Sequence, residues 1–142
     1  MFLGTFALKL DEKGRFFLPP KFRDAFKDGL VVTRSQDRCL AVFTTGAFEA
    51  RAKTALSAAD TRAAARNYQR MLASGASDDV PDKQGRVSIP QILRNYASLD
   101  RDIVVSGALD RLEVWQPEAF ERYTTENEPS FAKADEVIFP QE

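Results

Sequence analysis

Histidine is absent from this chain of 142 residues, and cysteine occurs once, as Cys39. The lack of imidazole removes the usual general base, a common zinc ligand and the pH switch that works near neutrality. Hydrolytic triads that depend on imidazole are excluded for the same reason. One cysteine allows no disulfide within a chain, which fits a reducing compartment, and its thiol is expected to be buried and inert. The composition therefore argues against an enzyme and indicates no cofactor and no metal site.

Long apolar runs are missing as well. A transmembrane helix needs about 18 or more consecutive apolar residues, and the chain contains no such run. The N-terminus lacks the basic segment that opens a secretory signal, so none is expected. Apolar residues make up 44% of the chain and charged residues 29%, which suits one compact domain or two small modules packed together. We expect a cytoplasmic protein that contacts no membrane and takes no small-molecule substrate.

Charge is nearly balanced in total but is unevenly distributed. The net charge is −1, and a value so close to zero does not by itself suggest a nucleic-acid partner. Residues 9–23, however, carry five basic side chains against two acidic ones, and residues 82–94 carry three against one. Residues 118–142 carry seven acidic side chains against two basic ones. The basic charge is therefore concentrated in two short segments.

These two basic segments are copies of one motif. Residues 11–19 read DEKGRFFLP, and residues 82–90 read DKQGRVSIP. The similarity continues downstream, where GLVVTRSQDRCLAVF at 29–43 is followed in the second copy by DIVVSGALDRLEVW at 102–115. An internal repeat predicts two similar structural units. Because a unit of about 45 residues buries too little apolar surface to be stable alone, each unit is expected to lend strands to the other.

The pattern of apolar residues and turn residues predicts an α+β fold that is rich in strands. A proline opens each of two short predicted helices, as is common at a helix N-terminus. In the first copy we expect strands at 4–10, 15–18, 30–33 and 39–43 and a helix at 20–26. In the second copy we expect strands at 79–81, 86–89, 103–106 and 112–115 and a helix at 90–96. A helical hairpin is expected at 45–73, a helix after 116, and a loosely ordered tail after 126.

The spacing of aspartate and glycine in the motif predicts a turn. Aspartate at the first position and glycine at the fourth are typical of a type I turn. The side chains of Asp11 and Asp82 can accept hydrogen bonds from backbone N–H groups of the turn. Gly14 and Gly85 can adopt the backbone angles that close it. These four residues are therefore predicted to be structural, whatever else the motif does.

The arginine after each glycine is not needed to form the turn. Arg15 and Arg86 follow their aspartates by four residues, so an ion pair across each turn is expected. A guanidinium group also suits phosphate oxygens and the guanine edge because its donors form a planar fork. Arg15 and Arg86, with Lys13 and Lys83 in the turns, are therefore the candidate DNA-binding residues.

The doubled Asp-x-x-Gly-Arg motif with its proline, and the LVVT…CLAVF and IVVS…LEVW segments, resemble the MraZ family of bacterial transcriptional regulators. The resemblance extends from residue 2 to about residue 123. It implies two SpoVT-AbrB-like modules, at 4–48 and 76–120, joined by a helical connector at 49–75 and followed by a helix end and acidic tail at 121–142. It also implies tandem swapped-hairpin modules in a pseudo-two-fold double-split β-barrel with flanking helices.

The same resemblance implies a function without catalysis. Members form ring homo-oligomers and bind double-stranded DNA with repeated short boxes, upstream of the division and cell-wall gene cluster and often at their own promoter. This implies association with the nucleoid, and it makes Arg15 and Arg86 the residues that contact DNA, followed by Lys13 and Lys83. A second interpretation stays open, namely a protein-interaction module like an antitoxin. In that case the acidic tail at 127–142 would bind a partner protein.

Overall fold

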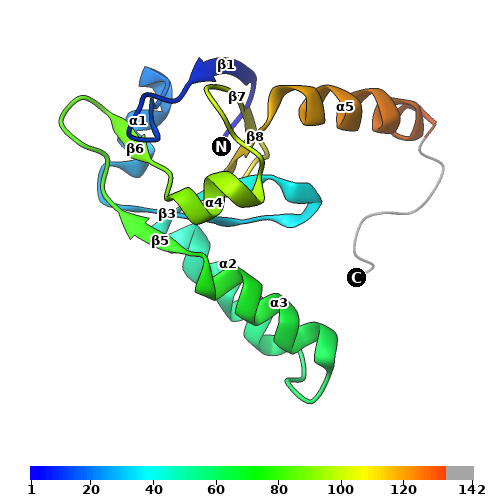
Figure 1. The fold of residues 1–142 in the computed structure, drawn as a ribbon. Helices are drawn as coiled ribbons and strands as arrows, with labels where there is room; N and C mark the ends of the chain where they lie inside the picture. The colour runs from blue at the N-terminus through cyan, green and yellow to red at the C-terminus, as the bar shows by residue number, and fades with distance from the viewer. Residues whose placement is uncertain (134–142) are drawn as a thin grey trace.

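A computed structural model describes residues 1–133 of the chain, and it has an α+β fold, as predicted (Figure 1). The elements of the first copy are β1 (Thr5–Lys9), β2 (Arg15–Phe17), α1 (Pro20–Phe26), β3 (Leu30–Arg34), a 3-10 turn (Gln36–Arg38), β4 (Leu40–Thr44) and α2 (Thr45–Ser57). After α3 (Ala63–Ser74), the second copy consists of β5 (Ser77–Asp79), β6 (Arg86–Ser88), α4 (Gln91–Tyr96), β7 (Asp102–Gly107), β8 (Leu112–Trp115) and α5 (Pro117–Ala132).

The two copies exchange strands. Six strands form an antiparallel sheet in the order β1-β7-β8-β4-β3-β5, and β2 pairs with β6 in a separate two-stranded ribbon. Strand β1 of the first copy therefore pairs with β7 of the second, and β5 of the second copy pairs with β3 of the first. This confirms that each copy completes the other. The described strands form an open sheet and a ribbon, so the double-split barrel stays a prediction.

The core lies between the inner side of the ribbon, the short helices and the sheet. In β2 and β6 the central residues Phe16 and Val87 are 0% and 2% exposed, because alternate side chains of a strand point to opposite faces. In the first copy the core is aromatic: the ring centroid of Phe2 lies 5.5 Å from that of Phe22 and 5.1 Å from that of Phe26. These contacts attach α1 to the N-terminal segment that leads into β1.

One predicted strand is displaced in the structure. The strand expected at 79–81 lies at Ser77–Asp79. The apolar Val80 favoured the later position, but its side chain is 55% exposed. Pro81 follows it and has no N–H to donate to a neighbouring strand. The pairing partner β3 instead reaches Ser77, Asp78 and Asp79.

The helices outside the core confirm one expectation and contradict another. The predicted helical hairpin is confirmed as α2 and α3, and Figure 1 shows it extending from the sheet in a different direction from α5. The expectation of a loose tail after 126 is wrong for residues 127–132, because α5 continues through Pro129 to Ala132. Proline inside a helix removes its own N–H donor and crowds the carbonyl four residues earlier. Pro129 lies in the last turn of α5, and its own carbonyl still accepts a hydrogen bond from the Lys133 N–H at 3.1 Å. The rest of the tail, 134–142, lies outside the described residues.

Two further properties of the described residues bear on function. No helix among residues 1–133 has the length and apolarity required to cross a bilayer. The Cys39 side chain is 1% exposed, as expected, and burial raises the pKa of its thiol to about 12. The reactive thiolate form is therefore disfavoured at neutral pH.

Candidate nucleic-acid interface

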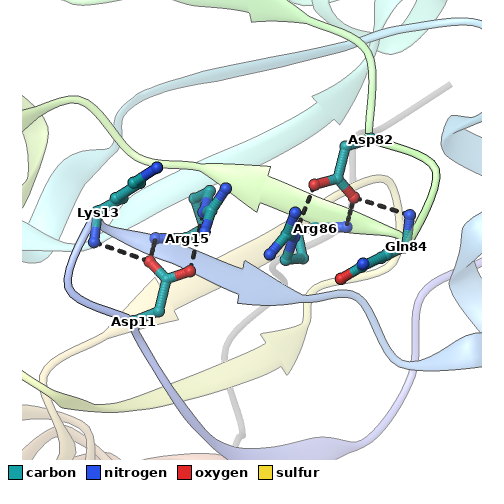
Figure 2. A network of polar contacts seen from close by, with 6 residues as sticks. All are labelled: Asp11, Lys13, Arg15, Asp82, Gln84 and Arg86. Carbon is teal, nitrogen blue, oxygen red and sulfur yellow. Dashed lines mark hydrogen bonds and ion pairs between the residues drawn. The ribbon is translucent and has the colours of Figure 1, made fainter.

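The first turn is closed by the side chain of Asp11 (Figure 2). One carboxylate oxygen, Oδ1, accepts hydrogen bonds from the backbone N–H groups of Lys13 and Arg15, both at 2.9 Å. The other oxygen, Oδ2, accepts from Nε of Arg15 at 2.8 Å. The Gly14 N–H donates to the Asp11 carbonyl at 3.0 Å, and Gly14 has a φ of 76°. The carboxylate therefore holds the turn and the arginine together, as the spacing predicted.

The second turn repeats this geometry. Asp82 Oδ1 accepts from the backbone N–H groups of Gln84 and Arg86, both at 2.9 Å, and Oδ2 accepts from Nε of Arg86 at 2.6 Å. The Gly85 N–H donates to the Asp82 carbonyl at 2.9 Å, and Gly85 has a φ of 79°. Two segments far apart in the chain thus make the same set of contacts.

These hydrogen bonds stabilise the ionised form of each aspartate. The backbone N–H of Arg15 is the largest cause that lowers the pKa of Asp11, and the Arg15 side chain and the Lys13 N–H lower it further. The backbone N–H of Arg86 is the corresponding cause for Asp82, with the Arg86 side chain and the Gln84 N–H. Both carboxylates are therefore charged at neutral pH, where they orient the guanidinium groups.

The ribbon brings the two arginines onto one face. Phe16 pairs with Val87 at its centre, Arg15 with Ser88, and Phe17 with Arg86. Because Phe16 and Val87 point into the core, Arg15 and Arg86 point outward. Figure 2 shows both guanidinium groups between the two turns, and each arginine side chain is 25% exposed. Within residues 1–133, each of these arginines forms its ion pair through Nε, which leaves the Nη donors for a ligand.

The two candidate lysines are not brought together. The turns lie at opposite ends of the ribbon because β2 and β6 are antiparallel (Figure 2). Lys13 and Lys83 are both exposed, one in each turn. Their positions within the turns also differ, since the N–H equivalent to that of Lys13 belongs to Gln84. Lys13 and Lys83 therefore flank the arginine pair at different places.

Two further arginines, Arg23 and Arg94, support the turns of the ribbon. The sequence patterns did not predict this role. Nε of Arg23 donates to the Leu18 carbonyl at 3.0 Å, and Nε of Arg94 donates to the Ile89 carbonyl at 2.9 Å. Each guanidinium also packs on the turn glycine of the other copy. A Cβ atom on Gly14 would lie 2.7 Å from Nε of Arg94. Their equal spacing from the motif proline was the only signal for this role.

This geometry can be compared with that of known families. The sequence model of a family described as "MraZ protein, putative antitoxin-like" matches residues 1–71 and again residues 72–140. The chain belongs to the MraZ family. The resemblance inferred from the motif is thereby confirmed, and each matched range contains one copy of the motif.

Relatives match the chain over nearly its whole length. The protein named "Transcriptional regulator MraZ" from Cutibacterium acnes is 53% identical over 142 residues, which covers 100% of both chains. Proteins of the same name from Micrococcus luteus and Leifsonia xyli are 49% and 50% identical over 140 residues, covering 99% of this chain and 98% of each relative. The relatives that carry the MraZ name therefore align with both copies of the repeat over nearly their full length.

Within this member of the MraZ family, the ribbon offers chemistry suited to binding. It presents two guanidinium groups that are fixed by carboxylates on a rigid antiparallel pair of strands. A fixed guanidinium loses little conformational freedom when it donates to an oxygen acceptor. The face formed by the outward side chains of β2 and β6, together with the two turns, is called the ribbon face below.

Proposed function

We propose that this MraZ-family chain is a sequence-specific, DNA-binding transcriptional regulator without catalytic activity, and that the ribbon face contacts the DNA. The observation that supports this most is the matched placement of Arg15 and Arg86 on one outer face, each held through Nε by an aspartate. The names of the relatives, all transcriptional regulators, point to the same function.

A two-stranded ribbon that carries arginine donors is suited to duplex DNA. The major groove admits a two-stranded β-ribbon, and arginine is the commonest side chain to read guanine there through O6 and N7. The Nη donors of Arg15 and Arg86 would make such contacts with bases or phosphates. Lys13 and Lys83, at the two ends, would contact the phosphate backbone, which positions the ribbon but carries no sequence information.

Assembly into a ring would strengthen this binding. Several ribbon faces on one particle would act together on repeated short boxes, because each further contact is made at a high effective concentration. Opposite charges on different elements support self-association: α3 carries Arg66 and Arg70, and α5 carries acidic side chains such as Glu121 and Glu126. The family resemblance further suggests the division and cell-wall gene cluster, including the chain's own promoter, as the target, and the nucleoid as the location.

The decisive experiment removes the two arginines of the ribbon face. Arg15→Ala/Arg86→Ala should weaken binding to the DNA upstream of its own gene by about thirtyfold or more, since each arginine-base contact contributes about 1–3 kcal/mol. The matched control is Lys53→Ala/Arg62→Ala, which removes two exposed charges from the α2–α3 hairpin. Mobility-shift titrations would measure the affinities, and circular dichroism and light scattering would check fold and assembly. Normal binding by the first variant, with fold and assembly intact, would place the DNA contact elsewhere.

A second candidate function is binding to a partner protein, as in an antitoxin. The family description contains the word "antitoxin-like", and Phe131 near the end of α5 is 86% exposed. Removal of residues 127–142 should then abolish capture of a protein partner while DNA binding stays normal. Retention of the partner by the truncated chain would exclude the tail as its binding site.

A further inference from the structure

The ribbon face is symmetric in its arginines but not in the residues beside them. The register of β2 and β6 places Arg15, Phe17, Arg86 and Ser88 on the outer side. Arg15 lies opposite Ser88, and Phe17 lies opposite Arg86. One half of the face therefore consists of an arginine and a phenyl ring, and the other half of an arginine and a hydroxyl group.

Phe17 is the unusual member of this set. Its side chain is 51% exposed, although its neighbour Phe16 is completely buried. The guanidinium carbon of Arg86 lies 5.9 Å from the centroid of the Phe17 ring, within the range of a cation–π contact. A single exposed apolar side chain is common on protein surfaces, but this one lies on the same face as the two arginines that the turns hold in place.

A phenyl ring at this place changes what the ribbon face can recognise. In the major groove, thymine is the base that presents a methyl group, and apolar side chains such as phenylalanine contact it. Neighbouring bases of a strand are about 3.4 Å apart along the axis, so a ring 5.9 Å from a guanidinium can reach one or two base steps away. Serine has no comparable preference, because its hydroxyl both donates and accepts hydrogen bonds.

We propose that Phe17 contacts the methyl group of a thymine one or two steps from the base that Arg86 reads, and that the ribbon face therefore binds a non-palindromic box in one orientation. This inference rests on the proposed function. Arg15 and Arg86 supply the affinity shared by the two halves, and Phe17 with Ser88 supplies the difference between them.

The test compares the effect of a thymine methyl group in several variants. The wild-type protein first selects its box from a random duplex pool, and each thymine of that box is then replaced in turn by deoxyuridine, which lacks the methyl group. One replacement should weaken wild-type binding by about fourfold, as expected for one buried methyl group. The same replacement should have no effect on Phe17→Ser. Phe17→Leu should keep the effect, because leucine preserves an apolar contact with the methyl group. Leucine offers Arg86 no aromatic face, so this variant separates the methyl contact from the cation–π contact.

Exchanging the two residues tests the orientation directly. The double variant Phe17→Ser/Ser88→Phe should move the methyl-dependent position to the opposite half of the selected box. Light scattering should give the same particle size for every variant, since the substitutions lie on the outer side of the ribbon.

The outcomes separate the inference from the function on which it rests. If the wild-type protein enriches no box, DNA binding itself fails and the inference fails with it. If the wild-type protein selects a box but deoxyuridine affects wild type and Phe17→Ser equally at every position, the function stands and the inference is wrong. A changed particle size for Phe17→Ser would likewise overturn the inference, because Phe17 would then be a contact between copies.

Discussion

In the first copy, the strand after the turn directs Phe16 into the core and Phe17 outward, and in the second copy these places hold Val87 and Ser88. The next helix repeats the contrast, with Phe22 buried in α1 and Leu93 buried in α4. The turns show no such difference. In both, one aspartate oxygen accepts two backbone N–H groups at 2.9 Å.

This comparison separates two kinds of position in the repeat. Aspartate, glycine and arginine of the turn make contacts that depend on backbone geometry, so both copies need the same residue types. The side chains on either side of the turn depend on the volume of the core or on a ligand, so the copies can differ there. The predictions below test where the equivalence of the copies fails and where it holds.

The largest difference between the two copies in their contribution to the free energy of unfolding is expected at the centre of the ribbon. Phe16→Ala should lower the free energy of unfolding by about 3–5 kcal/mol, the usual loss for a buried phenylalanine. Val87→Ala, which removes two methyl groups, should lower it by about 2 kcal/mol. Urea unfolding at one protein concentration, followed through the fluorescence of buried Trp115, would measure both. Equal losses would mean that the two copies contribute the same packing at this pair.

The two turn glycines should contribute equally to the free energy of unfolding. Gly14→Ala and Gly85→Ala should each lower the free energy of unfolding by about 1–3 kcal/mol, because alanine is strained at positive φ. The new Cβ would also displace the arginine that packs there from the other copy. Gly46 is the control, because a Cβ there meets no atom of residues 1–133 within 4 Å. Double-mutant cycles that pair Gly14→Ala with Arg94→Ala should show less than additive losses. Full additivity would contradict the contact between copies.

Acid should weaken both turns alike. The pKa of Asp11 and of Asp82 is lowered in the folded chain from the ordinary value of 3.8. The unfolded state therefore binds protons more readily, so this stabilisation is present above about pH 4 and is lost as the pH falls through the lowered folded values. Asp11→Asn and Asp82→Asn should each reduce the pH dependence of the urea midpoint below pH 4 by a similar amount, and the double variant should reduce it most. An unchanged slope in the double variant would contradict the assigned role of these carboxylates.

The smallest effects are expected from the turn side chains that face solvent, and they concern the salt dependence of DNA binding. If the ribbon face binds DNA, Lys13→Ala and Lys83→Ala should each reduce the slope of log affinity against log salt by about 0.9 for every phosphate that the lysine neutralises. Gln84→Ala, at the place equivalent to Lys13, should leave that slope unchanged. Lys53→Ala, which removes an exposed charge from α2, is the charge control. A reduced slope for Lys53→Ala would mean that α2 also contacts DNA.

Much of the local structure could be predicted from the sequence. The turns at Asp11 and Asp82, the short helices after the prolines and most strand positions follow from patterns within a few residues. The errors arose where such patterns compete. The strand expected at 79–81 includes Pro81, which has no N–H to donate to a neighbouring strand. The loose tail expected after 126 includes Pro129, through which α5 continues.

The sequence by itself determined that two copies of one unit are present and that each has an aspartate-closed turn followed by an arginine, because turn chemistry is local. Only the tertiary structure decided that β1 pairs with β7, that Arg94 packs on Gly14 of the other copy, and that Phe17 lies beside Arg86. These contacts join residues far apart in the chain, and they depend on which strands exchange hydrogen bonds and in which register. A short stretch of sequence has no information about that choice, because any strand with a suitable apolar face can offer the same backbone donors and acceptors.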